Sequence, residues 1–111
     1  MAGIVDKRKV GPVTILELGT RLTGAEVPEL HKTIRDLLEH GNHEVLLDCS
    51  SVTFIDSLGI GALVRSWVSV EKKGKLRLLG LSPRLCELLQ ITGLLKVMGS
   101  FDDVGEALRS F

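Results

Sequence analysis

The segment from residue 45 to residue 64, VLLDCSSVTFIDSLGIGALV, constrains the fold more than any other. It begins with a short continuous apolar run, which is typical of a central strand covered on both faces. A polar connection follows, and Asp56 and Ser57 then stand directly before an apolar run with glycines that predicts a helix. A strand that leads into a helix in this way is a building unit of sheets with packed helices.

Ser57 is predicted to lie at the N-terminus of this helix. Backbone amides in a first helical turn lack intrahelical partners, and the helix dipole is positive there. Such a position suits an oxyanion, or a phosphate attached to the serine hydroxyl. The competing interpretation is simple helix capping by Asp56 and Ser57, worth about 1 kcal/mol. The spacing alone leaves both interpretations open.

The remaining chain alternates between strand-like and helix-like periods. Residues 4–10 and 13–18 are extended segments joined by Gly11-Pro12, which predicts a hairpin. Residues 25–39 carry apolar side chains at helical spacing. The later segments predict a strand at 44–48, a helix at 57–72, a strand at 76–79, a helix starting at Ser82-Pro83, a short strand at 96–98 and a helix at 102–109.

The order of these elements predicts one α/β domain over residues 1–111. We expect a mostly parallel mixed sheet with an N-terminal antiparallel hairpin and about four helices. Within the helix at 57–72, the apolar face is predicted to consist of Ile60, Leu63, Val64, Trp67 and Val68, with Arg65, Ser66 and Ser69 elsewhere. Ligands in such sheets favour the carboxyl ends of strands, where the connection at 48–57 lies.

The composition argues against several classes of function. Lys and Arg number 14, as do Asp and Glu, so no basic excess favours direct nucleic-acid binding. The apolar stretches are too short for a membrane span, and the first residues lack the apolar core of a secretory signal. We therefore expect a cytoplasmic protein without membrane contact. Cys49 and Cys86 lie far apart and outside any metal-binding spacing, which favours free thiols.

Enzymatic readings find little support in the motifs. The run GIGALV superficially matches a dinucleotide fingerprint, but Val64 replaces the third glycine. Gly59 and Gly61 are better explained by close approach of another backbone, from the sheet or from a partner. No GxSxG elbow surrounds Ser57, and His31, His40 and His43 are interpreted as solvated surface residues. We expect no catalysis, cofactor or metal, with a small nucleotide-binding or hydrolytic module as an alternative.

Several motifs together carry a family resemblance. The run LLDCSSVTFIDSLGIGALV resembles the central motif of STAS domains, and KLRLLG, LSPRL and ITGL follow it at the matching places. Nearly the whole chain is similar to the stand-alone anti-sigma-factor antagonists of that family. In that family the serine after the aspartate is phosphorylated, and this position corresponds to Ser57.

The resemblance implies a switch in which the protein is a substrate and not a catalyst. The unmodified form would bind an anti-sigma factor with serine kinase activity and free the sigma factor. Phosphorylation of Ser57 would release that partner, and a metal-dependent serine phosphatase would reset the switch. A monomer or weak dimer is implied.

The resemblance also implies a partner-binding face. It comprises Thr23, Gly24, Asp56, Ser57, Leu58, Gly59, Gly61 and Arg65. Two positions depart from the family pattern, which often has an acidic residue in place of Thr23 and usually a small residue in place of Leu58. The larger Leu58 either shields Ser57 or gives the partner an apolar anchor.

A second interpretation keeps the same fold but assigns the domain a different function. A similar domain serves as a scaffold in a stress-sensing assembly or as a subunit of a membrane lipid-transport system. In those settings the identity of the partner defines the function, sometimes without phosphorylation.

Overall fold

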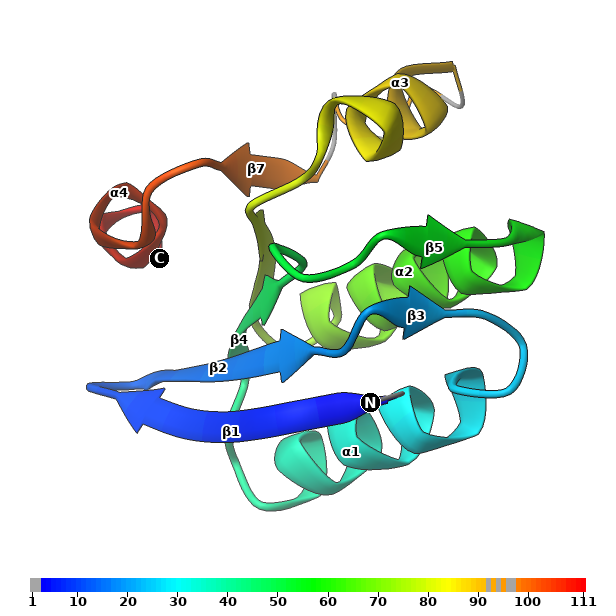
Figure 1. Cartoon of the computed structure of the whole chain (residues 1–111). Coiled ribbons are helices and arrows are strands. Elements are labelled where there is room, and N and C mark those ends of the chain that lie inside the picture. The colour runs from blue at the N-terminus through cyan, green and yellow to red at the C-terminus, as the bar shows by residue number, and fades with distance from the viewer. Residues whose placement is uncertain (1–2, 92, 94, 96–97) are drawn as a thin grey trace.

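A five-stranded mixed sheet forms the centre of the structure (Figure 1). The computed structural model describes residues 3–91, 93, 95 and 98–111. The strands are β1 (Ile4–Val10), β2 (Val13–Leu18), β4 (Glu44–Asp48), β6 (Lys75–Leu79) and β7 (Gly99–Phe101), in the spatial order β1-β2-β4-β6-β7. Strand β1 runs antiparallel to β2, with an irregularity between Ile4 and Asp6, and the other neighbours are parallel. The predicted α/β class and hairpin are confirmed.

Four helices cover the sheet in the described part of the chain. They are α1 (Val27–Glu39), α2 (Ser57–Glu71), α3 (Pro83–Ile91) and α4 (Val104–Arg109). Buried leucines of α1, α2 and α3 share one large hydrophobic cluster, whereas Ala107 of α4 belongs to a smaller one. Helices α1 to α3 therefore cover one face of the sheet, and α4 covers part of the other.

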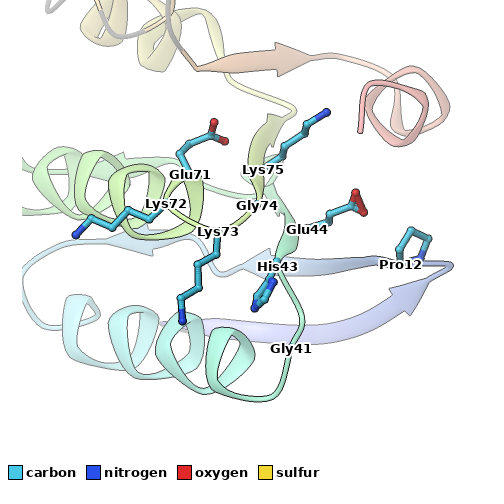
Figure 2. A pocket seen from close by; sticks show the side chains of 9 residues that line it. All are labelled: Pro12, Gly41, His43, Glu44, Glu71, Lys72, Lys73, Gly74 and Lys75. Atoms are coloured by element: carbon cyan, nitrogen blue, oxygen red, sulfur yellow. The ribbon is translucent and has the colours of Figure 1, made fainter.

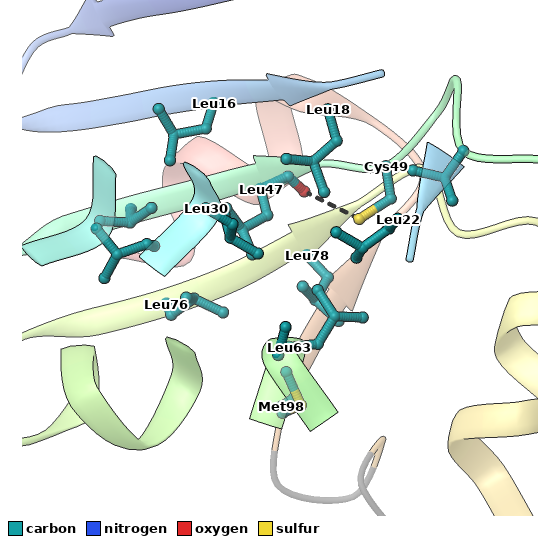
Figure 3. Packing of buried hydrophobic residues seen from close by; sticks show 14 of the residues in the cluster. Leu16, Leu18, Leu22, Leu30, Leu47, Cys49, Leu63, Leu76, Leu78 and Met98 are labelled. Carbon is teal, nitrogen blue, oxygen red and sulfur yellow. Dashed lines mark hydrogen bonds between the residues drawn. The ribbon is translucent and has the colours of Figure 1, made fainter. Parts of the chain in front are cut away.

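The core is built from strands that are buried on both faces. Val45 and Leu47 of β4 belong to the large cluster, whereas Leu46 between them belongs to the small one, and all three are fully buried. Figure 3 shows Leu47 among leucines of neighbouring strands, with Leu30 of α1 and Leu63 of α2 in the same packing. Full burial of one such side chain contributes about 1.5–3 kcal/mol. The prediction of a central strand here is confirmed.

Several predicted boundaries shift by two or three residues, and at α4 a local cap accounts for the shift. Helix α4 begins at Val104, since the Asp103 side chain caps it by accepting a hydrogen bond from the Glu106 amide at 3.0 Å. The last strand is Gly99–Phe101 and not 96–98 as predicted, and residues 96 and 97 lie outside the described residues. Helix α1 begins at Val27, two residues later than predicted.

The predicted buried face of α2 is partly wrong. Ser66 is 1% exposed although it was placed outside the apolar face, and Val68 is 43% exposed although it was placed within it. The buried residues Gly59, Leu63, Ser66 and Val70 follow the spacing of a single helical row. Gly59 contacts the backbone of a strand, and this contact orients the row of buried α2 residues toward the core.

A small second sheet was not predicted from the sequence. It pairs β3 (Arg21–Leu22) with β5 (Phe54–Ile55) in parallel, so that Arg21 lies opposite Phe54. Each strand has two residues, too few for any periodic signal. In Figure 1 these strands continue the chain beyond the ends of β2 and β4, next to α2. They deliver the loop at Gly24 and the start of α2 to the same end of the molecule.

Gly59 fits where no other residue does. A Cβ atom built on Gly59 would lie 2.0 Å from the carbonyl oxygen of Leu22, so α2 and β3 are in direct backbone contact. The predicted close approach is thus confirmed for Gly59. A Cβ on Gly61 would meet no described atom within 4 Å, so the space beside Gly61 is open.

We expect Gly59→Ala to lower the free energy of unfolding by about 2–3 kcal/mol, because the added methyl group forces α2 away from β3. Gly61→Ala is the matched control, because it makes the same substitution on the opposite side of the same helical turn. It should raise stability by about 0.5–1 kcal/mol, since alanine restricts the unfolded chain and meets open space. Urea denaturation of the three proteins measures both, and equal stability of the two variants would contradict the contact.

Candidate partner-binding site

One carboxylate organises the start of α2. The Asp56 Oδ1 atom accepts a hydrogen bond from the Gly59 amide at 2.9 Å, which makes Asp56 the N-cap of the helix. The Oδ2 atom of Asp56 accepts a second bond, from the Gly24 amide at 3.3 Å. Asp56 therefore fixes the loop after β3 to the first turn of α2. The helix cap anticipated at this place is Asp56, and Ser57 has no part in it.

Ser57 is the first residue of α2 and is exposed. Within the described residues its hydroxyl makes no hydrogen bond, because Asp56 already supplies the cap. The hydroxyl lies where the backbone amides of the first turn create a positive field. Ser57 is thus accessible to another protein, and the position tolerates added negative charge.

Thr23 stabilises the loop at Gly24, between β3 and α1. Its backbone amide and its hydroxyl both donate to Oε1 of Glu26, at 2.8 and 2.7 Å. Thr23 and Glu26 are each 7% exposed. The hydroxyl of Thr23 lowers the pKa of Glu26, and its amide and nearby Arg21 act in the same direction, whereas burial and Asp56 raise it. Thr23 therefore positions Gly24 and exposes little surface of its own.

Leu58 stands out from the surface with 64% of its area exposed. A Cβ on Gly24 would lie 2.7 Å from Leu58 Cδ1, so the leucine side chain extends over the Gly24 loop. Ser57 stays exposed beside it. The apolar surface of Leu58 is therefore open to solvent, and its position beside Ser57 leaves that serine exposed.

A groove of about 230 Å³ runs beside Ser57, between α1 and α2; we name it the Ser57 groove. It is lined by Gly24, Val27, Pro28, His31, Ser57, Leu58, Gly61, Ala62 and Arg65. Five of the predicted partner-binding residues therefore come together here, and Thr23, Asp56 and Gly59 support them from beneath. The contribution of α1 was missed, although Val27 and His31 stand one turn apart in the sequence.

His31 is half-buried, so its interpretation as a solvated surface residue is wrong. It packs in the seam between α1 and α2. Burial lowers its pKa below the ordinary value of 6.5, the charge of Arg65 adds to this, and the backbone of Ala62 acts in the opposite direction. A neutral imidazole at pH 7 follows, and Arg65 is then the permanent cation of the Ser57 groove.

Another hollow, of about 530 Å³, lies at the other end of α2. Figure 2 shows Lys72, Lys73 and Lys75 around it pointing in different directions. Side chains that diverge in this way do not form one binding site.

Burial raises the pKa of the Cys49 thiol to about 12, which makes it unreactive. Among the described residues no three His, Cys, Asp or Glu side chains are grouped to hold a metal ion.

Comparison with protein families gives a direct match. The model of the STAS domain matches residues 5–107. The chain belongs to the STAS domain family. An anti-sigma-B factor antagonist of Staphylococcus epidermidis is 32% identical over 84 residues, which cover 75% of this chain and 78% of that protein. Relatives at this level of identity therefore include anti-sigma factor antagonists.

Solved structures agree with this assignment. An anti-sigma-factor antagonist (STAS) domain protein from Planctomyces limnophilus is 28% identical with a TM-score of 0.82, covering 99% of this chain and 98% of that one. The Bacillus cell fate determinant SpoIIAA in its phosphorylated form shares the fold, with 20% identity and a TM-score of 0.75 over 96% of this chain and 98% of that one. In the described part of this STAS domain, no helix is long and apolar enough to cross a membrane.

The Glu26 carboxylate should make the stability of the domain depend on acidity. Its pKa is lowered in the folded state, so its stabilising contribution is present above the ordinary value of 4.5 and is lost as the pH falls through the lower folded value. Glu26→Gln keeps an acceptor for Thr23 but removes the charge. We expect the difference in unfolding free energy between wild type and Glu26→Gln to be largest near neutrality and to shrink below about pH 4. A difference independent of pH would contradict this.

Proposed function

We propose that this STAS domain is an anti-sigma factor antagonist controlled by phosphorylation of Ser57. The unmodified form binds an anti-sigma factor with serine kinase activity, which frees the sigma factor, and the phosphorylated form lets it go. A metal-dependent serine phosphatase restores the binding form. The observation that carries the proposal is the exposed, unbonded hydroxyl of Ser57 at the start of a helix that Asp56 caps. The names of its relatives support the partner class.

A phosphate on Ser57 would act on the interface and leave the fold intact. It adds a charge of about −1.5 to −2 at pH 7. The first-turn amides and the helix dipole make this charge tolerable within the domain. Beside it lies the Asp56 carboxylate, whose oxygens already accept the amides of Gly24 and Gly59. A partner docked on this surface would have to bury two neighbouring negative groups, which is strongly unfavourable.

The Ser57 groove supplies the contacts for the unmodified state. Leu58 offers an exposed apolar anchor, Gly61 leaves open space for a partner side chain, and Arg65 offers a charge. Arginine is among the residues that most often dominate the binding energy of an interface, and burial of an exposed leucine adds to it through its apolar area. Thr23, Asp56 and Gly59 hold these groups in place through the contacts already described.

Ser57→Ala should abolish phosphorylation and keep partner binding, because it removes only the acceptor hydroxyl. Ser57→Asp should weaken binding by about tenfold or more through charge at the interface. Incubation with ATP and the candidate anti-sigma kinase of the same genome, followed by intact-mass and phosphopeptide analysis, tests the first point. Calorimetric titration with that anti-sigma factor tests the second.

Ser100→Asp is the charge-matched control, since Ser100 is an exposed serine on β7 and lies outside the Ser57 groove and outside the helices that line it. It should bind the anti-sigma factor as the wild type does. Equal affinities of wild type and Ser57→Asp would contradict the electrostatic switch. Absence of phosphate with active kinases would favour the scaffold or lipid-transport subunit instead.

Leu58→Ala should reduce the affinity for the anti-sigma factor by about tenfold, because an exposed leucine at the interface loses its buried area in the complex. Stability should change little, since 64% of Leu58 is exposed. Ile91→Ala serves as control, because Ile91 is 82% exposed on α3 and lies away from the Ser57 groove. Equal loss of affinity in both variants would remove Leu58 as the anchor.

A further inference from the structure

A second, larger groove continues along the seam between α1 and α2, which lie on the same face of the sheet (Figure 1). Its volume is about 480 Å³, and we name it the α1–α2 groove. It is lined by His31, Ile34, Arg35, Leu38, Glu39, Arg65, Ser66, Ser69 and Lys73. It shares only His31 and Arg65 with the Ser57 groove. Its size falls in the range of small-molecule sites.

Two polar atoms in the lining of this groove are buried without a partner. The hydroxyl of Ser66, a residue 1% exposed, has no hydrogen bond, and neither has the Nε2 atom of His31. These are the unsatisfied buried side-chain atoms of the described residues. A buried polar group without a partner destabilises a fold, so native proteins rarely keep one unless a ligand, an ion or a bound water satisfies it. Both residues line the α1–α2 groove, so a ligand held there is the candidate partner for these atoms.

The charge of the α1–α2 groove indicates the kind of ligand. Arg35, Arg65 and Lys73 bring three permanent positive charges to it. The carboxylate in the lining is that of Glu39, which lies 4.0 Å from Arg35. In the described part of the chain, neither Arg65 nor Lys73 has an acidic side chain within 4.0 Å. Two uncompensated cations and an unpartnered hydroxyl in the lining of one groove suit a negatively charged group.

We propose that the α1–α2 groove binds a small organic anion, a carboxylate or a phosphate monoester with an apolar part. The acid group accepts from the Ser66 hydroxyl and pairs with Arg65 and Lys73. The apolar part packs against Ile34 and Leu38, which give the groove its apolar wall. The proposal is independent of phosphorylation at Ser57, since it requires neither the modification nor a partner protein.

His31 provides a reporter of occupancy. Its pKa is held below 6.5 by burial and by Arg65 of α2, against the backbone of Ala62. The other charged groups that line the groove are Arg35, Glu39 and Lys73. An anion bound here favours the protonated imidazole, so it should move the His31 pKa upward. A purely structural seam would leave this pKa unchanged.

Three probe molecules that share a benzene ring separate the contribution of the acid group from that of the ring. Benzoate and phenyl phosphate carry the two acid groups, and benzamide carries none. We expect at least one anion to bind with a Kd of about 1 mM or lower, as ligands of this size allow, and benzamide to bind at least tenfold more weakly. Amide and imidazole NMR shifts of α1 and α2 give the affinities and the His31 pKa. Binding of a single anion supports the proposal and identifies its acid group.

Two variants locate the site. Ser66→Ala should weaken binding of the anion about three- to tenfold, the usual effect of one lost hydrogen bond. Without probe it should raise Tm by several degrees, because it removes an unsatisfied buried hydroxyl. Lys73→Gln should also weaken binding, whereas Lys72→Gln, one residue away and outside the α1–α2 groove, should not.

The proposal is overturned if all three probes bind equally, or if no resonance of α1 or α2 moves up to about 50 mM of either anion. The proposal is also overturned if neither Ser66→Ala nor Lys73→Gln weakens anion binding, or if the pKa of His31 is unchanged when the anion saturates the protein. In those cases the polar atoms of the seam are satisfied by water alone. Phosphorylation of Ser57 and binding of the anti-sigma factor are separate readouts, so neither result depends on the other.

Discussion

The rest of the site depends on the Asp56 carboxylate, because each of its oxygens holds a different part of the chain. One oxygen caps α2 through the Gly59 amide, and the other holds the Gly24 amide of the loop after β3. These two bonds join segments that are 32 residues apart. Because Asp56 caps α2, the Ser57 hydroxyl is not needed to hold the helix start in place. Without these two bonds, the groove beside Ser57 would lose its floor and its shape, even if every residue that faces a partner were kept.

Much of the architecture could be predicted because its signals are local and strong. The Gly11-Pro12 turn, the leucine run of β4 and the acid before α2 each specify a structure within a few residues. What escaped prediction depends on contacts between distant segments. The pairing of β3 with β5 needs only two residues from each side, and the orientation of α2 follows from one glycine against Leu22. Periodicity carries no information about either.

The site shows the same division. The sequence and the family pattern together predicted five residues that line one groove, since they cluster around the start of α2. His31 was misjudged, because its burial results from how α1 meets α2, and no spacing within α1 reveals that. The same seam also holds the unpartnered Ser66, whose small polar side chain looks like surface in the sequence. Helix-to-helix packing therefore sets the chemistry of both grooves.

Strand β1 forms one of the two outer edges of the sheet. Its free edge could in principle pair with a strand of another molecule and begin an ordered aggregate. The segment Lys7-Arg8-Lys9 crowds this edge with like charges, and the irregularity between Ile4 and Asp6 bends it. Such features deter strand addition. Self-association through the β1 edge is thereby disfavoured, although this edge lies open along the whole length of the strand.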